Sequence, residues 1–595
     1  MFNRPGRLLS LFVAALAGAG AQVVNVPRAR IPQISVKLEP ETPSPAPVGT
    51  IVSFDATVSQ AGAGPLWYRF RVRPAGGEFR TVRDYGLDST LDWTASEQEG
   101  AYEMEVSVQD KRNRQAANAS LIYQFSSRVS GGQPVISPTE HPLVFLYSAP
   151  PCPAGSRMRV RFEAPGASGQ TTPYKPCSQG LSMNFYLAGM QLDSRYAVRH
   201  TVDSGSVSAD GPVLDFATAS VSPLIAGYSV TQPPPVPAVR GILLQSTLLR
   251  GPVATDLYGN LLWYYRGSIT LTNPETGGSF FGVVQDPLGD TSHQLVRQFD
   301  LAGMTIRETN AARVNEQLAL LGKRQIGSFH HEARGLPDGK ILVLASTERI
   351  LTDVQDEGPV DVIGDMILVL DRDLQVVWAW DTFDHLDPSR RATLEEVCLP
   401  MGGGCPTFYL APRANDWVHG NSLQLTPDGN ILYSARHRDW IIKIDYNNGA
   451  GSGAILWRLG KEGDFRIDSA DPSPWFSHQH DAQFERGDNS TLIVFDNGNV
   501  RRETDDNANS RGQVLRLDEA NRTATLLLNA DLGDYSRALG AAQRLPNGNY
   551  HFDLGLLPNG ASRSVEVDPA GKIVYDVQVP VSAYRTFRMW TLYTP

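Results

Sequence analysis

Residues 417–445 contain WVHGNSLQLTPDGNILYSARHRDWIIKID, and this stretch decides the fold prediction. His419 opens a short half-apolar run, which ends at the turn dipeptide Asp428-Gly429. Two further apolar runs, ILYSA and WIIKID, follow that turn. Because Asp-Gly pairs tolerate positive φ and favour tight hairpins, the stretch predicts consecutive antiparallel strands.

Two other segments repeat this arrangement. They are FHHEARGLPDG at residues 329–339 and SHQHDAQFERGDN at residues 477–489. In these units His331 and His480 stand where His419 stands, and an Asp-containing turn follows seven to nine residues later. A unit repeated around an axis brings equivalent positions together at that axis. The three histidines are therefore predicted to form one cluster, although they lie far apart in the sequence.

Residues 241–595 consist of short apolar runs between Asp-Gly and Asn-Gly pairs, such as Asn497-Gly498 and Asn547-Gly548. No strong amphipathic helical pattern interrupts them. One unit in roughly 50–60 residues predicts an all-β fold with a β-propeller of six or seven blades. A pair of separate β-sandwiches is the structural alternative.

The N-terminal part predicts a different all-β organisation. Residues 22–130 contain alternating runs such as LWYRFRVRP, which are typical of an immunoglobulin-like β-sandwich. Residues 131–230 repeat this style and predict a second β-sandwich-like domain. The Pro-rich residues 231–240 predict an extended linker, and the propeller is expected to occupy residues 241–595.

Length, composition and charge limit the class of protein. A chain of 595 residues is too long for a single core, and 41% hydrophobic with 19% charged residues is ordinary for a globular protein. The net charge of −10 and the lack of a basic block argue against nucleic acid as a partner.

Residues 1–21 have the features of a Sec-type signal peptide. Arg4 and Arg7 precede the apolar stretch LLSLFVAALAGAG, and Ala19-Gly20-Ala21 fits a cleavage site. A membrane anchor is the alternative, although the stretch is short for a span. No later stretch has the length and apolarity of a transmembrane segment. The mature chain is therefore expected to be periplasmic or secreted.

The four cysteines agree with an oxidising compartment. They fall into two local pairs, Cys152/Cys177 and Cys398/Cys405, and no CxxC motif is present. Four cysteines allow three pairings, of which local pairing into two structural disulfides is the simplest.

A cation accompanies the three histidines. Arg436 lies in ILYSARHRDWIIKID, and a fixed guanidinium there suits a tetrahedral oxyanion because it donates paired hydrogen bonds. A surface ion pair with Asp439 is the alternative for this arginine. Three aromatic residues flank the histidines and either line a pocket for a planar substrate or pack between blades: Trp417, Phe329 and Phe476.

Two chemistries fit these residues. Three neutral histidines can hold a catalytic Zn²⁺ with an open position, as in a metal-dependent hydrolase or lyase. Alternatively, one imidazole attacks an ester while the other histidines and Arg436 stabilise the transferred oxyanion. No GxxxxGK[ST] motif supports a nucleotide donor, and GxSxG and HExxH are absent. A non-enzymatic ligand-binding propeller is the third hypothesis.

Three blocks occur in order: HHEARGLPDGKILVL, then DWVHGNSLQL with ILYSARHRDWIIKID, then HQHDAQF with LIVFDNGN. Together they resemble the bacterial arylsulfotransferases, exported enzymes that work without the nucleotide donor PAPS. The resemblance covers most of residues 241–595. It implies a six-bladed propeller without cofactor or metal. It also implies ping-pong transfer of a sulfuryl group from an aryl sulfate donor to a phenolic acceptor through a sulfohistidine.

The resemblance assigns roles to individual residues. His480 corresponds to the nucleophile, and His419 and Arg436 correspond to sulfate-binding residues. A histidine of the His330/His331 pair corresponds to a third donor or acid/base. His331 is preferred because HEAR aligns with the HDAQ that begins at His480, which leaves His330 as a substrate-binding candidate.

The chain also departs from the family pattern. Family members have a smaller N-terminal β-domain, whereas two sandwich-like segments precede the propeller here. The family can carry a disulfide close before the catalytic histidine, whereas Cys398/Cys405 precede His419 in this sequence. The family further suggests a homodimer.

Overall fold

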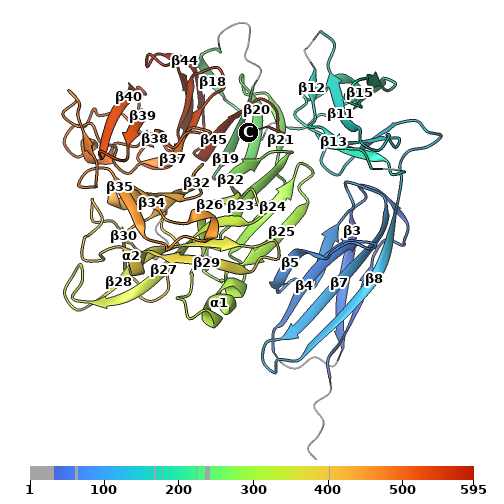
Figure 1. Ribbon diagram of the computed structural model, residues 1–595, viewed down its shortest axis with the longest axis horizontal. Helices are drawn as coiled ribbons and strands as arrows, with labels where there is room; N and C mark the ends of the chain where they lie inside the picture. Colours follow the sequence, from blue (N-terminus) through green and yellow to red (C-terminus); the bar gives the residue numbers. More distant parts are fainter. Residues whose placement is uncertain are drawn as a thin grey trace, which may run out of the picture.

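The computed structural model confirms the all-β prediction (Figure 1). Its described part contains many short strands and only three short α-helices, α1 (Ala311–Leu320), α2 (Thr382–His385) and α3 (Asn499–Arg502). None of the described helices is long and apolar enough to cross a membrane. The predicted signal peptide, residues 1–21, lies outside the described residues, which are 33–59, 64–166, 169–178, 180–222, 224–234, 241–400 and 403–594.

Two sheets that share one core form the N-terminal unit. One sheet contains β1 (Ser35–Pro40), β3 (Val52–Ser59) and β6 (Thr90–Trp93). The other contains β2 (Ala46–Pro47), β8 (Ala116–Ser126), β7 (Gly100–Asp110), β4 (Leu66–Pro74) and β5 (Arg80–Gly86). Alternate residues of these strands face inward, so Phe54, Phe70 and Phe125 meet in a single buried cluster.

Residues 135–217 form two further sheets. The smaller one contains β9 (Val135–Pro138), β10 (Phe145–Ala149) and β14 (Met183–Leu187). The larger contains β11 (Arg157–Glu163), β12 (Gln170–Thr171), β13 (Lys175–Pro176), β15 (Arg195–Asp203), β16 (Ser208–Asp210) and β17 (Leu214–Ala217). The predicted disulfide Cys152–Cys177 is confirmed in this unit. Its core continues into Trp263 and Phe299, so this unit packs directly against the C-terminal sheets.

The described C-terminal residues form six groups of paired strands, one of which, β22–β25, continues into the N-terminal sheet. Three of them contain β19 (Ile242–Thr247), β20 (Gly251–Asp256) and β21 (Leu261–Tyr264) with β45 (Ala583–Met589); β22 (Thr270–Glu275), β23 (Ser279–Val284), β24 (Leu295–Asp300) and β25 (Thr305–Asn310); and β26 (Phe329–Gly335), β27 (Ile341–Thr352), β28 (Pro359–Leu370) and β29 (Val376–Asp381), to which β30 (Val397–Cys398) and β31 (Ala414–Asp416) are added.

The other three sheets follow in chain order. They contain β32 (Gly420–Leu425), β33 (Ile431–Ala435), β34 (Trp440–Ile444) and β35 (Ile455–Leu459); β37 (His480–Phe484), β38 (Thr491–Asp496), β39 (Arg511–Asp518) and β40 (Thr523–Asp531) with β36 (Arg466–Ile467); and β41 (Ala541–Arg544), β42 (Tyr550–Leu554), β43 (Ser562–Val567) and β44 (Ile573–Val579) with β18 (Ser229–Gln232). Because β18 pairs with β44, the strands of the last sheet begin before the Pro-rich segment.

One edge strand of each sheet faces a common centre (Figure 1): β22, β26, β32, β37, β41 and β45. β22 contacts β26, β26 contacts β32, β32 contacts β37, β37 contacts β41, β41 contacts β45, and β45 returns to β22. The ring is closed by the end of the chain, because β45 pairs with β19 from Ile242 opposite Met589 onward. Closure of this kind removes exposed sheet edges at the seam.

Hydrophobic cores lie between successive sheets. Leu342 and Val369 of the sheet with β27 share a cluster with Tyr433 of the next sheet, and similar clusters lie between the sheets that follow. The strands of β27 and β28 are buried on both faces, as expected for near-continuous apolar runs such as ILVLA. Because apolar side chains fill the space between sheets, the polar side chains of the inner strands face the centre of the ring.

The guanidinium of Arg585 on β45 lies at that centre and is only 1% exposed. It donates hydrogen bonds to the Thr272 carbonyl on β22 (3.0 Å), the Glu332 carboxylate on β26 (2.9 Å) and the Asn421 carbonyl on β32 (2.6 Å). The Asp481 carboxylate on β37 lies 3.8 Å from its Nε. One side chain of the closing strand therefore contacts four other inner strands.

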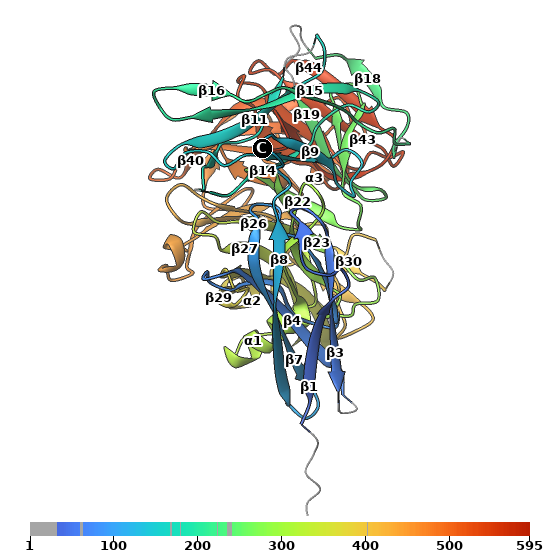
Figure 2. The same ribbon diagram turned by 90° about the vertical axis from the view of Figure 1, so that its right-hand side faces the viewer.

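The N-terminal unit joins the ring through β5 and β25 (Figure 2, where the blue strands lie beside the green ones). These strands pair in parallel at Arg83 and Glu308. Arg83 Nε donates to Glu308 Oε1 at 3.0 Å, and Arg297 on β24 binds the other oxygen of the same carboxylate. Glu308 itself is 3% exposed, so it is a shared acceptor for two guanidinium groups at this junction.

Replacing Glu308 by glutamine leaves those two cations without a shared carboxylate. We expect Glu308→Gln to lower the free energy of unfolding by roughly 2 kcal/mol, less than a fully buried pair would lose, because both arginines stay partly exposed. Urea unfolding followed by tryptophan fluorescence measures the change. Glu103→Gln, which removes an exposed partner of Arg73, is the matched control and should cost less than about 1 kcal/mol. Equal losses in both variants would contradict this role of Glu308.

Candidate active site

Three neighbouring inner strands have irregular register at their histidines. Pairing of β26 with β27 shifts between Phe329 and Ala333, and similar shifts follow Gly420 in β32 and His480 in β37. His331 and His419 have positive φ, at 57° and 50°. Such bulges redirect side chains, and non-glycine residues at positive φ are costly and cluster at functional sites. The backbone is therefore shaped locally to present these side chains at the centre.

The structure brings the sequence-predicted residues together. The rings of His331 and His419 lie edge to face with centroids 4.9 Å apart. His480 is close enough to both rings for their charges to interact, and Arg436 interacts with His480 in the same way. His480 is 2% exposed, while His419 and Arg436 are each 8% exposed. Histidines from β26, from the residue before β32 and from β37 thus share one buried cluster, the arrangement that the repeat pattern predicts.

His480 is held in one orientation by Asn497. The His480 Nδ1 atom lies 2.7 Å from Asn497 Oδ1. The amide nitrogen of Asn497 donates to the carbonyls of Ser536 (2.7 Å) and Leu539 (3.1 Å), which fixes its oxygen toward the imidazole. Nδ1 must therefore carry the hydrogen, and Nε2 of the neutral ring keeps its lone pair. Burial, followed by the charge of Arg436, holds the His480 pKa well below its usual value.

His330 and His331 have different surroundings, although they are adjacent. His330 Nε2 lies 3.2 Å from the Asp365 carboxylate, and its Nδ1 lies 2.8 Å from His331 Nδ1. Asp365 is fully buried, which alone would raise its pKa, but hydrogen bonds from His330 and Tyr433 outweigh burial and lower it. His331 instead contacts His419 and the ring of Tyr584, whose hydroxyl donates to the His331 carbonyl at 2.6 Å.

The tautomers in this pair follow from the Asp365 carboxylate. A hydrogen on His330 Nε2, which faces that carboxylate at 3.2 Å, is favoured electrostatically, and the Nδ1 atom of His330 then accepts from His331 Nδ1–H. The Nε2 lone pair of His331 then remains free. Burial, then the charges of His419 and His330, hold the His331 pKa well below its usual value, so this ring is neutral.

Arg436 begins the 3-10 turn η1 (Arg436–Arg438) after β33. Its Nη2 donates to the Arg537 carbonyl at 3.1 Å, while its Nε finds no hydrogen-bond partner among the described residues. Burial lowers the Arg436 pKa against the opposing charges of Glu396 and Asp416, but a guanidinium remains charged at neutral pH. A buried cation with a free donor is suited to an anionic ligand.

The three aromatic candidates lie in separate hydrophobic cores. Phe329, Trp417 and Phe476 are at most 1% exposed, and each belongs to a different cluster between sheets. Trp417 also donates its indole hydrogen to the Arg390 carbonyl. These three side chains therefore pack between sheets, as one of the two sequence-based interpretations expected, and do not line a pocket for a planar substrate.

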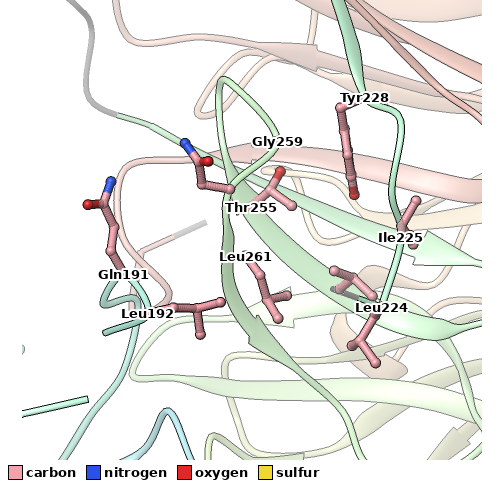
Figure 3. Close-up of a pocket in the computed structure, with 10 residues that line it drawn as sticks. Gln191, Leu192, Leu224, Ile225, Tyr228, Thr255, Gly259 and Leu261 are labelled. Atoms are coloured by element: carbon pink, nitrogen blue, oxygen red, sulfur yellow. The ribbon is translucent and has the colours of Figure 1, made fainter. Parts of the chain in front are cut away.

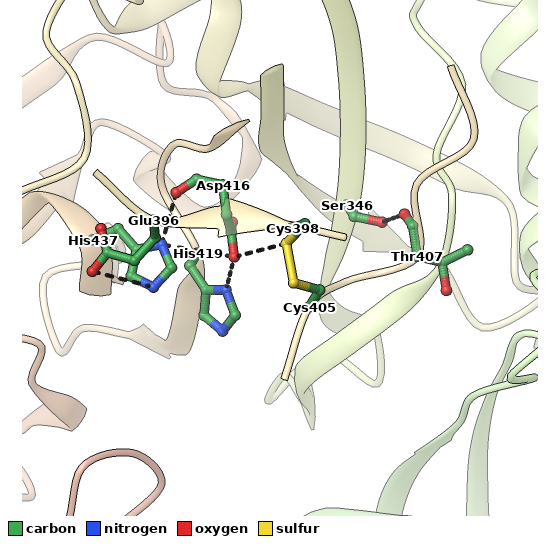
Figure 4. The surroundings of a disulfide bond; sticks show 8 residues. All are labelled: Ser346, Glu396, Cys398, Cys405, Thr407, Asp416, His419 and His437. Atoms are coloured by element: carbon green, nitrogen blue, oxygen red, sulfur yellow. Dashed lines mark hydrogen bonds and ion pairs between the residues drawn. A yellow bond between two sulfur atoms is a disulfide. The ribbon is translucent and has the colours of Figure 1, made fainter. Parts of the chain in front are cut away.

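Sequence reasoning missed much of the surrounding network. Asp416 Oδ2 lies 2.6 Å from His419 Nδ1, and the rings of His419 and His437 are 4.5 Å apart (Figure 4). The confirmed disulfide Cys398–Cys405 lies beside them, with Cys398 Sγ 3.6 Å from Asp416 Oδ2. The sequence did offer Asp416 as a carboxylate that could orient an imidazole, and the contact with His419 agrees with that interpretation. For His437 the only signal was its adjacency to Arg436.

His478 and Glu396 extend the network. His478 Nδ1 lies 3.0 Å from Asp439 Oδ1, and His478 Nε2 makes a close hydrogen bond with Glu396 Oε1. Burial and the charge of Arg436 would lower the His478 pKa, but the hydrogen bonds to Asp439 and Glu396 outweigh them and raise it. His478 is thus chemically distinct from His480, two residues further on, whose pKa is lowered.

A well-formed cavity elsewhere takes no part in this site. It has a volume of about 340 Å³ and lies between the second N-terminal unit and the first C-terminal sheet (Figure 3). Its lining includes Leu192, Leu224, Tyr228 and Leu261. The candidate site is therefore defined by its cluster of histidines and arginine, and not by this cavity.

The lowered pKa of His480 predicts a pH-dependent contribution to stability. Below about pH 6.5 the unfolded chain protonates this residue while the folded chain does not, so its contribution is complete above that pH and is lost as pH falls. His480→Gln should reduce the pH dependence of the free energy of unfolding between about pH 7.5 and 5.5. The reduction should reach up to about 1.4 kcal/mol per pH unit, which corresponds to one proton.

Urea titrations at a series of pH values measure this slope. His293, whose side chain is 60% exposed, provides the matched control, and His293→Gln should leave the slope as in the wild type. An unchanged slope in His480→Gln would contradict a neutral, buried His480.

Residues 216–588 match the model of a protein family described as Arylsulfotransferase (ASST). The matched span exceeds half of the 595-residue chain and includes His331, His419, Arg436 and His480. No curated protein matches this chain.

Proposed function

The chain belongs to the arylsulfotransferase family and is a sulfotransferase enzyme, and from this we propose its reaction, mechanism and location. The proposed reaction moves a sulfuryl group from a phenolic sulfate ester to a phenolic acceptor, without PAPS. The observation that carries the proposal is the neutral His480, whose Nδ1 is held by Asn497 beside a buried guanidinium. A neutral imidazole with a free Nε2 is a competent nucleophile.

In the first half-reaction the Nε2 lone pair of His480 attacks the sulfur of the donor ester. The new N–S bond forms as the bond between sulfur and the aryl oxygen breaks, and the phenolate leaves with the bonding electrons. The hydrogen on His480 Nδ1 stays there and remains hydrogen-bonded to Asn497 Oδ1. The sulfuryl group is now bonded to Nε2, so the intermediate is a sulfohistidine. Arg436 and His419, which is oriented by Asp416, are assigned to the sulfuryl oxygens.

In the second half-reaction the hydroxyl oxygen of the acceptor attacks the same sulfur. His331 Nε2 takes the phenolic proton while the N–S bond breaks and returns the electron pair to His480. The proton then passes from His331 to the released phenolate or to water. The contact of His330 with Asp365 supports a positioning role for His330, which leaves His331 as the acid/base.

The proposal extends to architecture and location. The closed contacts of six inner strands support a six-bladed propeller, and the two N-terminal units support immunoglobulin-like or fibronectin-like sandwiches before it. Residues 22–130, 131–230, 231–240 and 241–595 are the proposed mature segments. The two disulfides support an oxidising compartment, in agreement with export by a signal peptide at residues 1–21.

The experiment that tests the reaction follows nitrophenol release from p-nitrophenyl sulfate, with and without added phenol. Wild-type enzyme treated with chelator should release one nitrophenol per site without phenol and turn over continuously with it. His480→Ala should lose both signals by roughly 1,000-fold or more, while the exposed control His293→Ala should retain them. Continuous nitrophenol release at the same rate with and without phenol would indicate hydrolysis. Nitrophenol release that returns only when metal is added would indicate the metal-dependent alternative.

Asn497 should control the nucleophile without touching the substrate. Asn497→Leu has a similar volume but no acceptor for His480 Nδ1–H, so the ring loses its preferred tautomer and orientation. We expect kcat to fall roughly 100-fold with little change in KM. Asn497→Asp keeps an acceptor and should retain more activity than Asn497→Leu. Equal activity in wild type and Asn497→Leu would refute this positioning role.

A further inference from the structure

A second cluster lies next to the proposed sulfuryl site and has no part in its reaction. Glu396, His437 and His478 come from the segment before β30, from η1 and from the segment before β37. One ligand atom from each lies within 4.8 Å of the others. Two of the three side chains are almost completely buried, and Glu396 closes the group from its more exposed side.

Both imidazoles of the cluster are oriented through their Nδ1 atoms. His437 Nδ1 lies 2.7 Å from the Asp416 carbonyl oxygen, which can only accept a hydrogen bond. His478 Nδ1 faces the Asp439 carboxylate at an ion-pair distance of 3.0 Å, and that carboxylate accepts a hydrogen bond from the His478 backbone N–H at 2.7 Å. Histidines that bind metals commonly have their other ring nitrogen against a carbonyl or carboxylate oxygen, as both of these have. Both Nε2 atoms are then available as ligands.

These Nε2 atoms converge on one carboxylate oxygen. Glu396 Oε1 lies 4.0 Å from His437 Nε2 and in close contact with His478 Nε2 (Figure 4 shows Glu396 and His437). Tetrahedral zinc with bonds of about 2.0–2.1 Å needs ligand atoms about 3.3 Å apart. The three ligand atoms lie within 4.8 Å of one another, and the Glu396 side chain is 21% exposed, so this ligand can adjust its position more easily than the two buried histidines.

We propose that Glu396, His437 and His478 bind a divalent transition metal of the zinc class, with the fourth position open on the Glu396 side. Two imidazoles and one carboxylate favour zinc, cobalt or nickel over calcium and magnesium, which prefer oxygen ligands. The metal takes the place of the proton shared by His478 Nε2 and Glu396 Oε1.

Two neighbouring sets of potential ligands are less suitable. In the set Asp416, His419 and His437, the Nδ1 atoms of both histidines face oxygen atoms of Asp416 and are needed as donors there. In the set Cys398, Cys405 and Asp416, the two sulfurs are joined in a disulfide. By contrast, the Nε2 atoms of His437 and His478 make no hydrogen bond to a backbone carbonyl among the described residues, so they can bind a metal.

Metal in this cluster would connect three segments that meet beside Arg436. It would connect the loop that contains Cys398–Cys405 to the turn η1 and to the segment just before His480. It would also place positive charge next to a site that binds anions. The inference does not depend on the proposed sulfuryl transfer, because metal binding is measured without any substrate.

The test uses untagged full-length protein, freed of metal by chelator and dialysis. Added Co²⁺ should produce visible d–d absorption that saturates at one equivalent, and Zn²⁺ should displace it. Glu396→Gln should weaken Co²⁺ binding by roughly 100-fold or more, and Asp439→Asn by roughly 10- to 100-fold. Glu395→Gln is the matched control, because the neighbouring Glu395 is 70% exposed and faces Arg391. Its affinity should equal that of the wild type.

The outcomes separate the proposal from its alternatives. Wild-type protein without saturable Co²⁺ absorption would overturn it and leave an ion pair between His478 and Glu396. Equal affinities in Glu396→Gln and Glu395→Gln would overturn it as well. Loss of binding in Asp416→Asn but not in Glu396→Gln would assign the metal to the other histidine set. Circular dichroism of each variant distinguishes loss of a ligand from loss of fold.

Discussion

The guanidinium of Arg585 is the interaction on which the rest of this structure depends. It is buried on the closing strand β45 and contacts the four inner strands β22, β26, β32 and β37. An unpaired charge would be very costly at such a position, so the strands that surround it must supply acceptors. Glu332 supplies a carboxylate, and Arg585 in turn keeps its charge because that carboxylate and neighbouring Asp481 raise its pKa against burial. The same buried side chain therefore links the closing strand to the ring and requires polar acceptors at its centre.

The same constraint explains the chemistry of the histidines. Side chains that face the centre are removed from water, so an imidazole there is neutral unless a carboxylate holds its proton. His480 and His331 have no such carboxylate and have strongly lowered pKa values. His478 faces Asp439 and Glu396, and its pKa is raised. Closely spaced histidines of the same chain thus differ in protonation according to their neighbours, and this difference underlies the separate roles proposed for His480, His331 and His478.

The two proposed centres are coupled through shared residues. Asp416 orients His419 with its side chain and His437 with its backbone carbonyl. Arg436 acts electrostatically on both His480 and His478. The disulfide Cys398–Cys405 lies against Asp416 and restrains the loop that carries Glu396. A substitution in one centre should therefore alter the orientation of side chains in the other, even though one is proposed to transfer a sulfuryl group and the other to bind a metal.

The sequence by itself determined the strand-and-turn units, the two local disulfides, the family, and the equivalence of His331, His419 and His480. These depend on local periodicity, turn chemistry and repetition, which a chain displays before it folds. Only the tertiary structure decided how Asn497 fixes the tautomer of His480, or how Glu396 meets two histidines from other segments. Those contacts join residues 17 positions apart in the first case and up to 82 in the second, and no local pattern encodes them. The first contact exists because β37 pairs with β38, and the second because three separate segments meet beside Arg436.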